Sequence, residues 1–161
     1  MISINGCGYQ PSAKFAREVL GEKVSTSVVV SSQDPENTVI IKDALDSAII
    51  EVFQTSLVSK AESTTHLIVS IGGTDYVPIV YDKNGYVTGY RMNLVLNIKS
   101  FKNGNNKEYN LNGFYDFAIA PNALLTDQER FDAIKFSAQK AIRSFIAKVS
   151  ADGARSKKSK E

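Results

Sequence analysis

The chain has 161 residues, of which 43% are hydrophobic, and a formal net charge of +2 at pH 7. This length suits one domain with one hydrophobic core, and the small net charge gives no support for a partner that is bound by bulk electrostatics, such as a nucleic acid. The single cysteine, Cys7, excludes an intramolecular disulfide, and no apolar run approaches the roughly 20 residues of a membrane-spanning helix.

The N-terminus resembles the end of a bacterial lipoprotein signal, in which a cysteine becomes the lipidated first residue of the mature protein. Ile4 lies three positions ahead of Cys7, and the small residue Gly6 lies directly ahead of it. Six residues are too few for a charged start and an apolar core of about seven residues, so residues 1–6 would be the remnant of a truncated signal. A free buried cysteine is the alternative. We expect residues 7–23 to form a lipid-anchored leader.

Two helices and one strand are predicted in the first third of the chain. Residues 12–20 predict a short helix within the leader, and the β-branched residues 24–31 predict a strand. Asp34 as N-cap and Pro35 in the first turn predict the start of a long helix that continues to about Leu57. Its apolar residues recur at helical spacing: Ile41, Leu45, Ala48, Ile49, Val52 and Phe53.

A long hairpin is predicted in the middle of the chain. Residues 65–71 form a strand that Gly72-Gly73 interrupts with a bulge or a bend. Residues 74–102 then predict two strands joined at Asn84-Gly85, because an Asn-Gly pair between alternating runs is typical of a type I′ turn.

With Asn84-Gly85 as the loop, Lys83 faces Tyr86 and Val77 faces Met92. The apolar residues of both strands then share one face, because side chains alternate with a period of two. Lys83 lies at the tip of this hairpin. It is either a charge that keeps the turn soluble or a contact to an anionic group.

The next strand repeats the pattern and extends the same apolar face. If Gly104-Asn105 is the loop that follows, Ile98 faces Leu111 and Met92 faces Phe117. The opposite face of the sheet is polar and rich in asparagine; it includes Arg91, Asn93, Asn97, Lys99, Glu108, Asn110, Asn112 and Asp116. Such a face is either solvated or packed against the polar interior of a large β-barrel, and the sequence alone does not choose between them.

Thr126 and Glu129 form a capping box that begins a C-terminal amphipathic helix. Its apolar stripe contains Phe131, Ile134, Ala138, Ala141, Ile142, Phe145 and Val149. Residues 151–161 are predicted to be a disordered basic tail, either solvated or bound to a nucleic acid or a membrane surface. Residues 24–150 then form one α+β domain of order β-α-β-β-β-α, a two-layer sandwich with a four-stranded, mostly antiparallel sheet and two long helices on one face.

No set of residues in the sequence has a spacing that is typical of catalysis. His66 is the only histidine and has no visible acid or nucleophile beside it. Gly72-Gly73 follows a strand but precedes no helix, so the geometry of a phosphate loop is missing. Asp43 and Asp46 are expected to be solvated on a helix. We expect a protein that is not an enzyme and that holds no metal and no cofactor.

The order of these features resembles the LptE family of lipopolysaccharide-assembly lipoproteins, also called rare lipoprotein B. The similarity extends from residue 7 to about residue 149, and two segments contribute most to it. One is Cys7-Gly8-Tyr9, and the other is the block from Lys83-Asn84-Gly85 to Tyr90 with Met92.

This resemblance implies an outer-membrane lipoprotein on the periplasmic face, anchored through a lipid on Cys7. It would plug and help to assemble an LptD-type β-barrel and would bind lipopolysaccharide during its transport to the cell surface. The family's basic residue at the hairpin tip matches Lys83. Its second basic residue has no counterpart, because residues 122–127 contain no Lys or Arg; Arg91 is a candidate replacement.

Two other functions compete with this one. The first is a generic envelope module that binds a ligand or a peptide, for which a deep apolar pocket between helices and sheet would be expected. The second is a hydrolase, which would need a polar cluster around His66.

Overall fold

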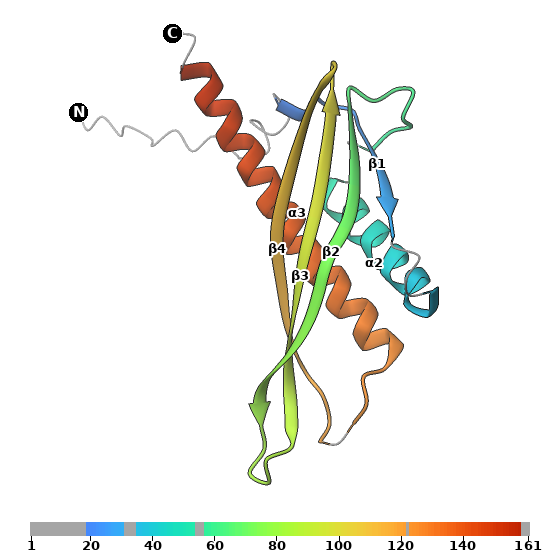
Figure 1. The fold of residues 1–161 in the computed structure, drawn as a ribbon, viewed down its shortest axis with the longest axis vertical. Coiled ribbons are helices and arrows are strands. Elements are labelled where there is room, and N and C mark those ends of the chain that lie inside the picture. The colour runs from blue at the N-terminus through green and yellow to red at the C-terminus, as the bar shows by residue number, and fades with distance from the viewer. Residues whose placement is uncertain (1–18, 31–34, 54–56, 122, 159–161) are drawn as a thin grey trace, which may run out of the picture.

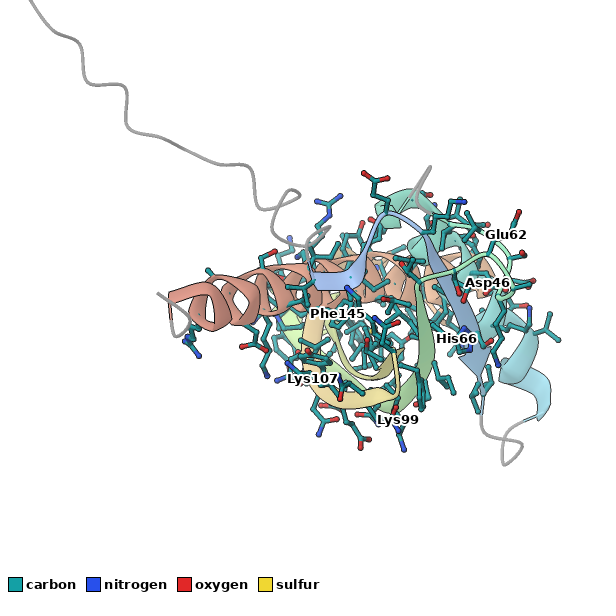
Figure 2. All side chains as sticks on the ribbon, turned by 90° about the horizontal axis from the view of Figure 1, so that it is seen from above. Asp46, Glu62, His66, Lys99, Lys107 and Phe145 are labelled. Atoms are coloured by element: carbon teal, nitrogen blue, oxygen red, sulfur yellow. The ribbon has the colours of Figure 1, made fainter. Side chains whose placement is uncertain are left out.

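The computed structural model describes residues 19–30, 35–53, 57–121 and 123–158 (Figure 1). Its elements are β1 (Val24–Val29), α2 (Pro35–Phe53), β2 (Thr65–Tyr81), β3 (Val87–Lys102), β4 (Asn105–Ala118) and α3 (Asp127–Lys158). The sheet has the order β1-β2-β3-β4, with β1 parallel to β2 and the other pairs antiparallel. Both helices lie on one face of it (Figures 1 and 2). The predicted α+β sandwich is confirmed.

The hydrophobic core fills the space between the two helices and the sheet. Every second residue of β3 points into it, as the period of a strand requires, and α3 contributes the stripe that its sequence predicts. The largest fully buried side chains are Phe145, Leu45, Leu67, Met92, Leu94, Leu96, Ile98 and Ile142. Each such side chain contributes about 1.5–3 kcal/mol on burial.

The capping box at the start of α3 is confirmed. The Glu129 amide donates to Thr126 Oγ1 at 3.2 Å, and the Thr126 amide donates to Glu129 Oε2 at 2.8 Å. The Thr126 hydroxyl also donates to the same carboxylate oxygen at 2.9 Å. These bonds from Thr126 lower the pKa of the Glu129 carboxyl. They satisfy amides that a helix start leaves without partners inside the helix.

The C-terminal end of α3 corrects one prediction. The helix continues to Lys158, so residues 151–158 are helical and not a disordered tail. The apolar stripe ends at Val149, but Ala151, Ala154 and Arg155 have high helix propensity and prolong the helix beyond its packed part. At the other end of the chain, Val19 and Leu20 are helical. The rest of the predicted helix over 12–20, and Cys7, lie outside the described residues.

The β2–β3 turn has a three-residue loop, not the two-residue type I′ loop that was predicted. The Asp82 amide donates to Tyr86 O at 2.9 Å, and the Gly85 amide donates to Asp82 O at 3.0 Å. Gly85 alone in this loop has a positive φ, of 84°. The Asp82 carboxylate accepts the amides of Asn84 and Tyr86 at 2.8 and 2.9 Å. This side chain favours a type I turn followed by a left-handed glycine, which the Asn-Gly rule does not take into account.

The longer loop shifts the register of β2 by one residue, so the predicted pairing of Val77 with Met92 is wrong. Tyr76 faces Met92, and Val77 faces Arg91. A shift of one residue moves side chains to the other face of a strand. Tyr76 therefore packs against the core, whereas Val77 is exposed. The register shift between Ile71 and Gly73 confirms the predicted bulge.

The β3–β4 turn lies one residue earlier than predicted, which shifts the pairing of β3 with β4 by two residues. Its loop is Asn103-Gly104, with φ values of 50° and 79°, and not Gly104-Asn105. Ile98 therefore faces Tyr109, and Met92 faces Tyr115. Because a shift of two residues preserves the faces of a strand, the predicted core face of β3 and β4 is correct even though the predicted pairs are wrong.

Candidate functional site

The face of the sheet that turns away from both helices is the first candidate site. We call it the uncovered face and define it by residues of β3 and β4: Arg91, Asn93, Val95, Asn97, Lys99, Glu108, Asn110, Asn112, Phe114 and Asp116. In Figure 2, Lys99 points away from the helices, whereas Phe145 lies between helices and sheet. Asn97 faces Asn110, and its amide lies over Gly72, where an added Cβ would be 2.7 Å from it. Amide groups therefore dominate the middle of this face.

The charges on the uncovered face form two cross-strand ion pairs. Arg91 Nε and Nη2 donate to the two carboxylate oxygens of Asp116 at 2.7 and 2.8 Å. The hydrogen bond from Arg91 lowers the pKa of the Asp116 carboxyl. Lys99 Nζ lies 3.7 Å from Glu108 Oε1. The charges that β3 and β4 contribute to this face therefore cancel in pairs.

Arg91 also contacts the Phe114 ring in a cation–π interaction that the sequence did not reveal. Its guanidinium carbon lies 4.7 Å from the centre of the Phe114 ring, and Lys140 Nζ lies 4.1 Å from the same ring. Lys140 comes from α3, so its side chain reaches past β4 to the uncovered face. Both cations lie at distances that are typical of cation–π interactions. Arg91 is thus already engaged by Asp116 and Phe114.

The hairpin formed by β2 and β3 is the second candidate site. It projects beyond the helices (Figure 1) and exposes apolar and aromatic side chains: Val77, Ile79, Val80, Tyr81 and Tyr86. Lys83 is exposed in its loop and has no ion-pair partner within the described part of the chain. Arg91 faces Val77 on the neighbouring strand, and Val77 precedes Lys83 by six residues. Six residues of strand span about 20 Å. The structure therefore does not bring Lys83 and Arg91 together.

His66 lies in a small polar cluster that links β1 to β2. Its Nδ1 is 2.8 Å from Ser25 Oγ, and its Nε2 is 3.3 Å from Ser27 Oγ. Ser25 Oγ also lies 2.8 Å from Ser63 Oγ. Burial, with a smaller effect of the Lys60 charge, lowers the pKa of His66, so the imidazole is neutral at pH 7. Ser25 is only 3% exposed, which hides this hydroxyl from a substrate.

The described residues contain no group of three or more His, Cys, Asp or Glu side chains that could hold a metal ion. None of their helices combines the length and the apolar character that crossing a membrane requires.

Comparison with known proteins gives a family and a fold. The model of the LptE family, described as lipopolysaccharide-assembly, matches residues 25–149. No curated protein matches the sequence. Among solved structures, a putative lipoprotein from Caulobacter crescentus has 10% identity and a TM-score of 0.51, with 89% of this chain and 98% of that chain covered, and it shares the fold.

Two more solved structures have lower scores. The rare lipoprotein B from Shewanella oneidensis has 11% identity and a TM-score of 0.39, with 84% of this chain and 95% of that chain covered. A minor lipoprotein from Acinetobacter baumannii has 10% identity and a TM-score of 0.44, with 81% and 92% covered.

Proposed function

The chain belongs to the LptE family of lipopolysaccharide-assembly proteins, and from this membership we propose that it plugs the barrel of an LptD-type outer-membrane partner and binds lipopolysaccharide. Its role lies in lipopolysaccharide assembly, as for the family. The finer proposal is that the uncovered face packs against the barrel interior while the hairpin contacts lipopolysaccharide on its way to the cell surface.

The observation that supports the plug is the composition of the uncovered face. The interior of a large outer-membrane barrel is polar, and the asparagine side chains of β3 and β4 supply both donors and acceptors to such a wall. The two ion pairs, Arg91 with Asp116 and Lys99 with Glu108, leave no unpaired charge among the named residues of this face. A buried charge without a partner would oppose docking.

The hairpin suits an anionic amphiphile. Lys83 offers a flexible point charge to a phosphate without demanding a bidentate geometry. The exposed side chains behind it, among them Tyr81 and Val80, provide apolar contacts for acyl chains. Arg91 is the second candidate cation from the sequence, and a phosphate there would join an existing pair with Asp116. Lys140 adds a cation beside it.

The proposed localisation is the periplasmic face of the outer membrane, with the anchor on Cys7. This residue lies outside the described part of the structure, so the proposal rests on the sequence around it and on family membership. The lipid would hold the protein on the membrane, while the folded domain makes the protein contacts.

A generic envelope binding module is the alternative. It would need an apolar pocket between the helices and the sheet, but Phe145, Met92 and Leu96 are fully buried in that space. A ligand there would have to displace core side chains, which costs several kcal/mol.

Purification of the protein from membranes tests the proposal directly. We expect a large outer-membrane barrel protein to be recovered with it and to be identified by mass spectrometry. We also expect Cys7→Ser to release the protein from the membrane fraction. Recovery of a monomer alone, with Cys7→Ser still retained on membranes, would contradict both the plug and the anchor.

Lys83→Glu is expected to weaken binding to lipopolysaccharide by roughly threefold to tenfold, because it replaces an attraction to phosphate with a repulsion. The fold should not change, since Lys83 is exposed in a turn. Binding can be measured by titration with purified lipopolysaccharide at low and high salt. Lys60→Glu, in an exposed loop, is the control for net charge. Equal binding by wild type and Lys83→Glu, or no dependence on salt, would show that Lys83 is only a solubility residue.

A further inference from the structure

A pocket of about 240 Å³ lies at the end of the fold opposite the hairpin tip, beside the β3–β4 turn. It is lined by Val19, Leu20, Ser100, Lys102, Asn103, Asn105, Lys107 and Tyr109. Lys102 Nζ donates to the carbonyl oxygen of Val19 and so joins the start of the described chain to the end of β3. Neither the plug nor the lipopolysaccharide contact of the proposed function uses this pocket.

The pocket is basic. Its lining contains two lysines and no carboxylate, and neither Lys102 nor Lys107 has a carboxylate within ion-pair distance in the described residues. Next to the Tyr109 wall, α3 brings both signs of charge: Lys148 Nζ lies 6.0 Å from the centre of the Tyr109 ring, and burial together with the charge of Asp152 raises the pKa of Tyr109. Glu108, next in sequence to Lys107, is on the uncovered face and is engaged by Lys99. The charge of the lining is therefore positive.

The other lining groups define what kind of anion would fit. The amides of Asn103 and Asn105 and the hydroxyl of Ser100 are polar, whereas Val19, Leu20 and the Tyr109 ring provide an apolar wall. Tyr109 is held in place by the edge of the Phe145 ring, with the ring centres 5.1 Å apart. A volume of this size is too small for a whole lipid, but it accommodates a headgroup. Lysines suit a phosphate because each acts as a mobile point charge.

We propose that this pocket binds the phosphate of an anionic phospholipid headgroup and holds this end of the protein against a membrane surface. The surroundings of the pocket support this source of phosphate. The last part of α3 carries the exposed Arg155, and α3 ends at the same end of the molecule as the β3–β4 turn (Figure 1). A cluster of basic residues is attracted to an anionic bilayer by about 1 kcal/mol for each residue near the surface.

The path of the chain agrees with this orientation. Val19 lines the pocket and lies 12 residues after Cys7. A segment of that length spans at most about 40 Å. A lipid on Cys7 would therefore hold Val19 within about 40 Å of the membrane surface, which is short enough for the pocket to reach that surface.

The test uses the full chain carrying Cys7→Ser, so that no lipid anchor contributes to binding. Sedimentation with vesicles of phosphatidylcholine, with or without phosphatidylglycerol, measures the affinity for an anionic surface. We expect binding that requires phosphatidylglycerol, and affinity about tenfold or more weaker for Lys102→Ala/Lys107→Ala. The control Lys42→Ala/Lys60→Ala removes the same charge from α2 and from the exposed loop between α2 and β2, and it should bind nearly as well as the parent.

Each other outcome overturns the proposal. Equal losses in both double variants would show that only the net charge matters, and no loss in either would exclude the pocket. A second measurement is an NMR titration with inorganic phosphate. If phosphate saturates the pocket but the protein does not bind vesicles, the pocket is a site for small anions and not for a membrane lipid. Urea unfolding checks that the variants are folded. Recovery of the barrel partner should be unchanged in Lys102→Ala/Lys107→Ala, which separates this proposal from the function proposed above.

Discussion

Replacement of Gly113 by alanine is expected to lower the free energy of unfolding by about 3 kcal/mol, because α3 packs directly on the backbone of β4 at this position. A Cβ on Gly113 would lie 1.9 Å from the carbonyl oxygen of Ser137 and 3.0 Å from the amide nitrogen of Ala141. Both atoms belong to the helix backbone and cannot rotate away as a side chain does. The helix would have to move off the sheet, which would loosen the contacts of Phe145 and Ile142 in the core.

Gly73→Ala is the matched control for this substitution. Gly73 also lies in a long strand, but an added Cβ there meets no atom within 4 Å. The change in free energy should stay within about 0.5 kcal/mol. Urea denaturation followed by circular dichroism measures both variants, with the slope checked for two-state behaviour. Similar stability of the two variants would contradict the close approach of helix and strand at Gly113.

The parts of the fold that could be predicted are those with long, regular periodicity. The alternation along residues 86–101 and the helical stripe that starts at Phe131 each extend over several turns or pairs, so a local irregularity does not change the face that they bury. This explains why the layers and the core were correct although the predicted pairing of β3 with β4 was wrong by two residues. The shift preserved the parity of every pair.

The register of the strand pairs was harder to predict, because a single side chain in a turn can decide it. The Asp82 carboxylate, by accepting two loop amides, selects a three-residue loop and moves Val77 from the core face to the surface. The wrong prediction of the β3–β4 loop also led to a missed contact in the candidate site. The predicted loop pairs Ala118 with Arg91, whereas the Asn103-Gly104 loop pairs Asp116 with Arg91. The correct turn would have revealed this ion pair from the sequence.

The contact between Lys140 and Phe114 could not be predicted in this way. It depends on where α3 crosses the sheet, and Gly113 determines this position by allowing the helix to approach β4. Sequence periodicity gives the buried stripe of a helix but not its displacement along the strands that it covers. Residues that reach past the edge of a sheet are therefore missed when each element is analysed by itself.

Asn110→Arg/Asn112→Arg is expected to reduce recovery of the barrel partner by about tenfold or more. The two side chains lie in the middle of the uncovered face, opposite Asn97 and Val95, and are exposed in the isolated protein. In water the new arginines remain solvated, so the free energy of unfolding should change by less than about 1 kcal/mol. Against a barrel wall they would add bulk and two charges without partners to a face whose ion pairs now cancel, and burial of such charges opposes binding.

Affinity purification from membranes, with the barrel quantified by mass spectrometry, measures this effect. Ser144→Arg/Ala147→Arg adds the same charge to exposed positions of α3 and should retain the partner. If both double variants lose the barrel, a general effect of positive charge explains the result; if both retain it, the uncovered face is not the docking surface. Loss in the strand variant alone would place the barrel against the asparagine-rich side of the sheet, because the two variants differ only in the face that carries the new cations.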